Sequence, residues 1–174
     1  MKTFLLNLVL LLSFTLTTNA QNLIYKGNTQ YQATENWNFK INGTAWSDDL
    51  EVTIGKNGEK GIIMLQTGVT PDSYIGGNIY IFLSNGTKIT CLDKKNRDNV
   101  DNKSIVIYDL TTNEVEMLKE NYIMSIRFTI QPSSHGGFNG NKTADNKINI
   151  FSFNQSDDKN YIETDVKISE LFNN

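Results

Sequence analysis

The chain has 174 residues, and its 16 Lys and Arg residues are outnumbered by 19 Asp and Glu residues, which gives a formal net charge of −3. This balance speaks against nucleic acid or an anionic membrane surface as the partner, because binding to either depends on a strongly basic face. A single cysteine, Cys91, excludes an intramolecular disulfide, so a hydrophobic core has to stabilise the fold.

Residues 1–20 have the composition of a secretory signal peptide: a lysine, an apolar run over 4–16, and then small or polar residues. The apolar run is shorter than the roughly 20 residues that a transmembrane helix needs, and no later stretch is apolar enough to span a bilayer. We therefore expect cleavage before Gln21, a bacterial source, and a single domain over 21–174. The mature protein should be periplasmic or extracellular and should carry no transmembrane segment.

Asn-Gly dipeptides predict three β-hairpins, at 42–43, 57–58 and 85–86. A type I′ turn requires positive φ at both central positions, and Asn-Gly flanked by alternating apolar residues is its strongest sequence signal. In the first hairpin this turn would place Phe39 opposite Trp46 on an aromatic core face.

The second hairpin would place Val52 opposite Ile63 on one apolar face, with Ile62 and Met64 on the reverse. The third would place Tyr80 opposite Cys91. Its two faces would then both be apolar, so we expect this hairpin to be covered on both sides. One face would hold Tyr80, Phe82, Ile89 and Cys91, and the other Ile79, Ile81, Leu83 and Leu92.

Residues 104–110 and 121–130 are rich in β-branched and aromatic side chains and predict two strands. Between them, Thr111 and Glu114 have the spacing of a capping box and predict a short helix near 111–119.

Residues 147–153 and 161–168 predict a last pair of strands, because apolar or β-branched side chains alternate along both. A terminal helical turn over 166–171 is the alternative for the second segment. With about nine or ten short strands and one short helix, the sequence predicts an all-β fold, an antiparallel β-sandwich or a flattened barrel.

The polar loop 93–102 raises the possibility of a Ca²⁺ site through Asp98 and Asp101, but it lacks the ligand spacing of an EF-hand and contains three cations. Cys91, with His135 as its base, would need a partly exposed, electropositive setting, whereas the predicted hairpin places it on an apolar face. We therefore expect a solvated loop and an unreactive buried thiol, and we assign no catalytic residue, metal site or cofactor.

Two Gly-containing stretches, 67–78 and 131–146, are predicted to be long loops, and each carries an aromatic residue. Binding sites on β scaffolds tend to lie on such loops. If both loops lie at the same end of the sandwich, Tyr74, His135 and Phe138 would form an aromatic and polar contact patch.

The expected export, the β fold and the lack of a catalytic motif together favour a binding or interaction module, with a protein, a glycan or an envelope component as the partner. One alternative is a secreted hydrolase whose acid pair or Cys/His site forms only in three dimensions. Another is a structural or assembly protein that uses an exposed sheet edge. The sequence leaves the oligomeric state open.

Overall fold

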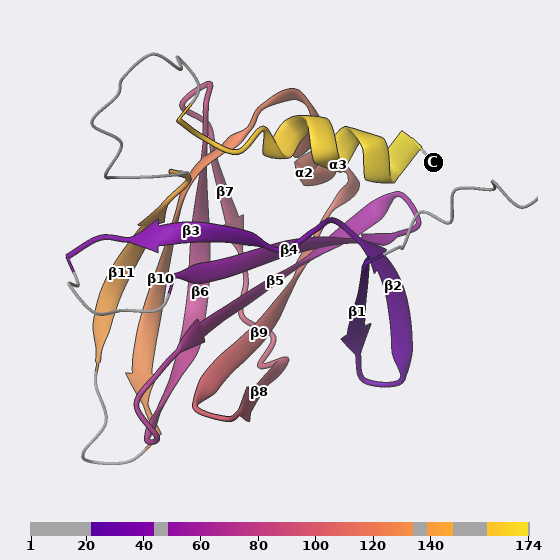
Figure 1. Ribbon diagram of the computed structural model, residues 1–174. Helices are drawn as coiled ribbons and strands as arrows, with labels where there is room; N and C mark the ends of the chain where they lie inside the picture. Colours follow the sequence, from indigo (N-terminus) through magenta and orange to yellow (C-terminus); the bar gives the residue numbers. More distant parts are fainter. Residues whose placement is uncertain (1–21, 44–48, 134–138, 148–159, 174) are drawn as a thin grey trace, which may run out of the picture.

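The computed structural model describes residues 22–43, 49–133, 139–147 and 160–173. Within these ranges eleven antiparallel strands form one sheet that folds back on itself (Figure 1). The same ranges contain two helices. The first half, or first sheet, runs in the order β3 (Trp37–Ile41), β4 (Leu50–Asn57), β5 (Lys60–Gly68), β9 (Lys103–Leu110) and β8 (Arg97–Val100). The second sheet runs in the order β7 (Lys88–Cys91), β6 (Ser73–Leu83), β10 (Ile123–Pro132) and β11 (Gly140–Asp145). The predicted antiparallel sandwich or flattened barrel is confirmed.

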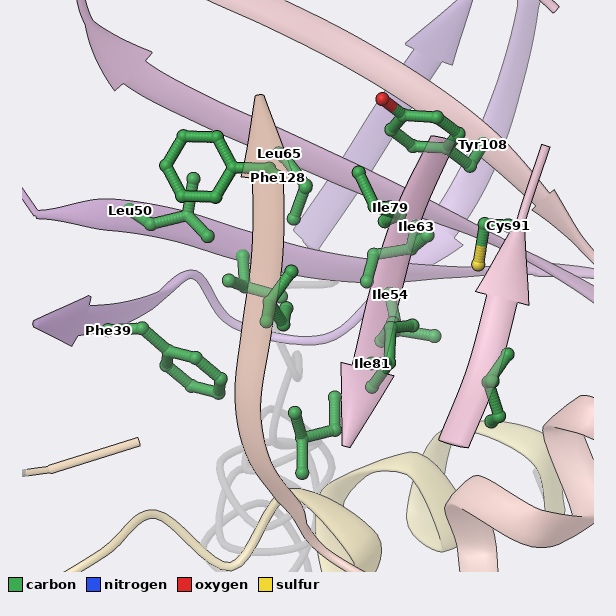
Figure 2. Packing of buried hydrophobic residues seen from close by; sticks show 14 of the residues in the cluster. Phe39, Leu50, Ile54, Ile63, Leu65, Ile79, Ile81, Cys91, Tyr108 and Phe128 are labelled. Carbon is green, nitrogen blue, oxygen red and sulfur yellow. The ribbon is translucent and has the colours of Figure 1, made fainter. Parts of the chain in front are cut away.

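The hydrophobic core fills the space between the two sheets, where the inward side chains of both meet (Figure 2). Phe39, Leu50 and Leu65 of the first sheet and Ile79 and Ile81 of the second are all fully buried. The two sheets are continuous only through β11 and β3, which share two residue pairs. Side-chain packing therefore holds the sheets together over most of their area.

A hairpin of β1 (Asn22–Lys26) and β2 (Thr29–Ala33), which the sequence did not predict, packs on the outer face of the first sheet. It forms a second, smaller apolar cluster, in which Ile24 and Ala33 meet Ile62 and Ile107. β5 is consequently buried on both faces, since Ile62 and Ile63 are both fully inaccessible to solvent.

The helix α2 (Thr112–Glu120) confirms the predicted helix near 111–119. The Thr111 side chain accepts a hydrogen bond from the Glu114 N–H, and the Glu114 carboxylate accepts one from the Thr111 N–H, so the capping box is complete. Val115 and Leu118 point into the main core.

The predicted strand over 161–168 is wrong, because Thr164–Asn173 form the helix α3, which lies beside α2 (Figure 1). Thr164 and Ile168 are buried one turn apart, while Val166 is 46% exposed. The buried Thr164 hydroxyl accepts the Ile123 N–H at 2.8 Å, which anchors the start of the helix. The helical alternative for this segment was therefore closer, and the alternation from Ile162 to Ile168 does not reflect a pleated strand.

The three Asn-Gly hairpins do not form the predicted type I′ turns. β3 and β4 do pair, but Phe39 faces Leu50 instead of Trp46, which lies outside the described residues. Asn42 continues the pairing with the second sheet through its N–H, which donates to the Thr143 carbonyl. The β3–β4 connection is thus longer than a tight turn.

In the β4–β5 hairpin the turn is shifted by one residue, because Asn57 pairs with Lys60 and the central residues are Gly58 and Glu59. Gly58 has φ +62°, as the first central position of a type II′ turn requires. The shift changes the pairing register by two residues, so Val52 faces Leu65. Because strand side chains alternate with period two, the predicted faces remain correct.

In the β6–β7 hairpin the loop has three residues, 84–86, and the register shifts by one. The Gly86 N–H donates to the Leu83 carbonyl, and Gly86 itself has φ +82°, the geometry of a type I turn followed by a left-handed residue. Cys91 therefore faces Ile79 instead of Tyr80. The prediction that both faces are covered is wrong, because the inward face is buried and the outward face is open.

Residues 93–102 and 131–146, which we expected to be loops, each contain a strand. β8 lies within 93–102 and turns into β9 at Asp101 and Asn102, whose φ values of +50° and +62° make this the actual type I′ turn. β11 lies within 131–146 and pairs with β10.

The predicted strands over 104–110 and 121–130 correspond to β9 and β10. Of the predicted strand over 147–153, only Lys147 belongs to the described residues. The predicted signal peptide lies entirely outside them. Neither helix of the described part of the chain has the length and hydropathy needed to cross a bilayer.

Candidate binding face

The outer face of the second sheet, which we call the open face, carries outward side chains from β7, β6, β10 and β11. Cross-strand pairing places four of them in one row, Thr90, Tyr80, Arg127 and Thr143. A parallel row contains Lys88, Phe82, Ser125 and Asp145. Tyr80 and Phe82 are half-buried, and Lys88 and Arg127 are exposed. Two aromatic rings thus lie next to each other on a rigid, solvent-facing sheet.

Each ring of the open face carries a cation above it. Lys88 Nζ lies 5.1 Å from the centroid of the Tyr80 ring. The Arg127 guanidinium lies 5.6 Å from the centroid of the Phe82 ring. These are weak surface contacts, worth on the order of 0.5–1 kcal/mol each, so a ligand could displace them.

A hollow of about 320 Å³ lies at the end of this face, between Asn78, Tyr80, Arg127, Thr129 and Asn141. Its rim is rich in groups that can donate or accept hydrogen bonds. The Thr129 hydroxyl donates to the side-chain amide oxygen of Asn141 at 2.9 Å. Ring, guanidinium and amides therefore converge on one small depression.

A bulge in β6 shapes this hollow. Thr129 pairs with Gly76 and Arg127 with Tyr80, so residues 77–79 of β6 are opposite Phe128 alone. Gly77 has φ +77°, and its N–H points away from β10 to donate to Asp93 Oδ2 at 2.9 Å. The bulge turns Asn78 outward, as bulges near sites commonly do, and Asn78 Oδ1 accepts the Asp93 N–H at 3.0 Å.

Asp93 fixes the bulge from the side of the first sheet. Its carboxylate accepts hydrogen bonds from Gly77, from the Lys95 N–H and from the Arg97 guanidinium. Partial burial alone would raise the pKa of Asp93, but these hydrogen bonds and the Arg97 charge together lower it below its usual value. The carboxylate is therefore ionised at neutral pH and links β6 of the second sheet to β8 of the first.

Tyr108 of β9 supports the same bulge from within. Its hydroxyl donates to the Gly77 carbonyl at 2.9 Å. Burial, followed by the nearby Asp93 charge, raises the pKa of Tyr108 well above its ordinary value. The hydroxyl thus remains a donor at any physiological pH, and Figure 2 shows the ring at the edge of the core with this hydroxyl directed away from it.

Cys91 lies on the opposite, inward side of β7, at 2% exposure, and its sulfur points into the core (Figure 2). Burial, with a smaller contribution from Glu114, raises the pKa of the Cys91 thiol to about 12. The thiol is protonated and inaccessible at neutral pH, so it cannot act as a nucleophile in this conformation.

Tyr74, one of the three residues predicted to form a contact patch, lies in β6 and not in a loop, because only residues 69–72 connect β5 and β6. Its ring is half-buried under the Arg97 guanidinium, 4.8 Å from the ring centroid. The two predicted loops do adjoin, since the Ser133 N–H donates to the Asp72 carbonyl at 2.8 Å. His135 and Phe138 lie outside the described residues, so their part in the patch stays a prediction.

Within the described ranges, no group of three or more His, Cys, Asp or Glu side chains is arranged to hold a metal ion. In the 93–102 stretch, Asp98 accepts the Asn99 N–H and Asp101 is a turn residue. The Asp98 carboxylate therefore serves the local backbone.

Sequence reasoning missed the residues of the open face because it placed Tyr80 and Phe82 on a buried side of their hairpin. The signal that could have identified them is the outward set itself: Tyr80, Phe82, Lys88 and Thr90 alternate with five aliphatic or thiol side chains, Ile79, Ile81, Leu83, Ile89 and Cys91. Comparisons with protein-family models, curated proteins and solved structures find no match to this chain.

Proposed function

We propose that this protein is an exported binding module that recognises a glycan on the open face. The observation that carries the proposal is the pair of half-buried outward rings, Tyr80 and Phe82, of which Tyr80 lines the hollow together with the amides of Asn78 and Asn141. A sugar ring has apolar C–H faces and a polar rim of hydroxyls. Aromatic faces match the first, and amide and hydroxyl side chains match the second.

The rigidity of the scaffold supports the proposal. The two rings lie in the middle of paired strands, and β6 is hydrogen-bonded on both sides by β7 and β10. Little conformational freedom has to be lost when a ligand binds to such a preorganised surface. A hollow of about 320 Å³ also lies at the lower end of the usual range for small-ligand sites.

The hydrolase alternative has less support among the described residues. Its cysteine is sealed in the core, and the two acids with lowered pKa values, Asp93 and Asp109, are both hydrogen-bonded to cations that keep them ionised. A general acid requires the opposite, a carboxyl pKa raised towards neutrality.

An array of immobilised polysaccharides, followed by calorimetric titration of those bound, tests the proposal. We expect at least one glycan to bind, and Tyr80→Ala and Phe82→Ala each to weaken it about tenfold, the effect of losing a central aromatic contact of about 1.4 kcal/mol.

The matched control is Tyr25→Ala, because Tyr25 is a 64% exposed aromatic residue on the β1–β2 hairpin, away from the open face. It should bind like the wild type. An array without any bound glycan, or an equal loss in all three variants, would contradict the proposal.

A further inference from the structure

The open face differs in charge from the chain as a whole. Its outward residues include the cations Lys88 and Arg127 but a single acid, Asp145. Asp145 lies at the β3 side of the face, where Lys147 pairs with it at 3.2 Å. The complete chain, in contrast, has a formal net charge of −3. A positive surface has thus formed on an acidic protein.

The two cations over the rings also differ from most others in the molecule. Lys26, Lys40, Lys94, Arg97, Lys103, Lys119, Lys147 and Lys167 each have a carboxylate within 3.2 Å. Among the described residues, neither Lys88 nor Arg127 has a carboxylate partner. Arg127 also lines the hollow, so its guanidinium is available to an incoming anion.

We propose that the glycan bound on the open face is a uronic-acid polysaccharide, whose carboxylates pair with Arg127 and Lys88 while its sugar rings stack on Phe82 and Tyr80. This inference rests on the proposed function. A guanidinium fits a carboxylate with two parallel hydrogen bonds, and it would move from the Phe82 ring to the ligand as the sugar takes its place. The amides around the hollow complete the recognition of hydroxyl groups.

Nucleic acid shares the negative charge and the stacking surfaces of this ligand class. The open face, however, offers only a few cations, whereas nucleic-acid affinity depends on many phosphate contacts along a basic surface. The acidic remainder of the chain would repel a long phosphate backbone. A polysaccharide with one carboxylate per sugar suits two separate cations better.

The experiment compares polygalacturonate with its methyl ester, which has the same backbone without the charge, by calorimetric titration of the purified protein at low salt. We expect the acid to bind at least about fivefold more tightly, the effect of one or two exposed charge pairs. Added salt should reduce this preference, because exposed charges are screened over about 10 Å at 0.1 M ionic strength.

The double variant Lys88→Gln with Arg127→Gln should bring the ratio of acid to ester affinity close to one. Lys60→Gln is the matched control, because Lys60 is an exposed lysine of β5 on the other sheet, and it should keep the preference. Alginate, a second uronate polymer, should behave like polygalacturonate.

Equal affinity for acid and ester would overturn the uronate assignment and leave the glycan proposal standing. Equally tight binding of single-stranded poly(dT) would overturn it in favour of a general polyanion surface. If Tyr80→Ala retained full affinity for polygalacturonate, the location of the glycan site itself would be wrong, and the proposed function would fail with it.

Discussion

The two sheets have the same antiparallel architecture, but the outer face of the first is covered by the β1–β2 hairpin and the outer face of the second is open. On β5 the outward position 62 is Ile, which is fully buried under Ile24 of the hairpin. On β6 the outward positions hold Tyr80 and Phe82, which remain half-exposed beside exposed cations. The difference teaches that the outward residues of each strand decide whether a sheet face becomes core or surface.

Thiol labelling gives the largest expected contrast between the two sides of the second sheet. Cys91 lies on the inward side with a pKa raised from 9.0 to about 12, so its thiolate fraction alone lowers the reaction rate about a thousandfold. Native protein should label slowly with a thiol reagent and completely after denaturation.

The variant Thr90→Cys with Cys91→Ala moves the thiol to the neighbouring outward position and serves as the matched control. It should label in the native state at close to the rate of a free thiol. Rapid labelling of wild-type Cys91, or protection of the thiol at 90, would show that the observed register of the β6–β7 hairpin is wrong.

Substitution in the apolar cluster should separate the covered face from the open one. Ile62→Ala removes a fully buried side chain and should lower the free energy of unfolding by roughly 2–4 kcal/mol. Phe82→Ala on the open face should lower it by roughly 1 kcal/mol or less, because part of that ring is already in water. Urea unfolding followed by tryptophan fluorescence measures both, and equal losses would mean that the open face is covered as well.

The variant Asp93→Ala should weaken the contact that Asp93 makes between the two sheets. The variant leaves the Gly77 N–H and the Arg97 guanidinium without their acceptor, which should lower the unfolding free energy by roughly 1–3 kcal/mol. Because the Asp93 carboxylate also holds the bulge through the Gly77 N–H, next to Asn78, glycan binding should weaken more than it does in Ile62→Ala. If the variant lost stability but kept full affinity for the glycan, the Asp93 contacts would not contribute to the binding site.

The ion pairs between the hairpin and the first sheet should give the smallest effect, and it should depend on pH. Asp109 binds Lys26 of β1 and Lys94; the Lys26 hydrogen bond is the main reason that its pKa lies below the ordinary value of 3.8. A lowered folded-state pKa contributes stability above the unfolded-state value and loses it as the pH falls through the folded-state value.

Asp109→Asn should therefore lower the unfolding free energy at pH 7 by about 0.5–1 kcal/mol, the range for partly exposed pairs, and should flatten the loss of stability below about pH 4. Thermal unfolding between pH 2 and 7 measures this. A variant whose acid profile overlays that of the wild type would exclude a contribution from this pair.

Local sequence patterns predicted the elements whose signals are themselves local. The helix α2 has its capping box, Thr111 and Glu114, in the sequence, and the structure contains both hydrogen bonds. The end of the chain has no such signal: Ile162, Thr164, Val166 and Ile168 fit a strand as well as a helix. Helical structure prevails there because Thr164 binds the Ile123 N–H and Ile168 packs into the core.

The hairpins show how one residue of loop length decides the predicted site. At 57–58 the turn moved by one position, the register by two, and every side chain stayed on its expected face. At 84–86 the loop gained one residue, and Tyr80 and Phe82 came to lie on the outward face. The candidate binding face could therefore not be predicted from a turn signal that specifies the hairpin but not its loop length.

The sequence by itself determined the all-β class, the β4–β5 and β6–β7 hairpins, the first helix and the buried character of Cys91, because these follow from turn residues, capping residues and apolar alternation within a few positions. Only the tertiary structure decided the registers, the strands β8 and β11, the helix α3 and the open face. Those features depend on contacts between distant segments, such as Asp93 with Gly77 and Ile24 with Ile62. Their free energy exists only once both partners are in place, so no local pattern records it.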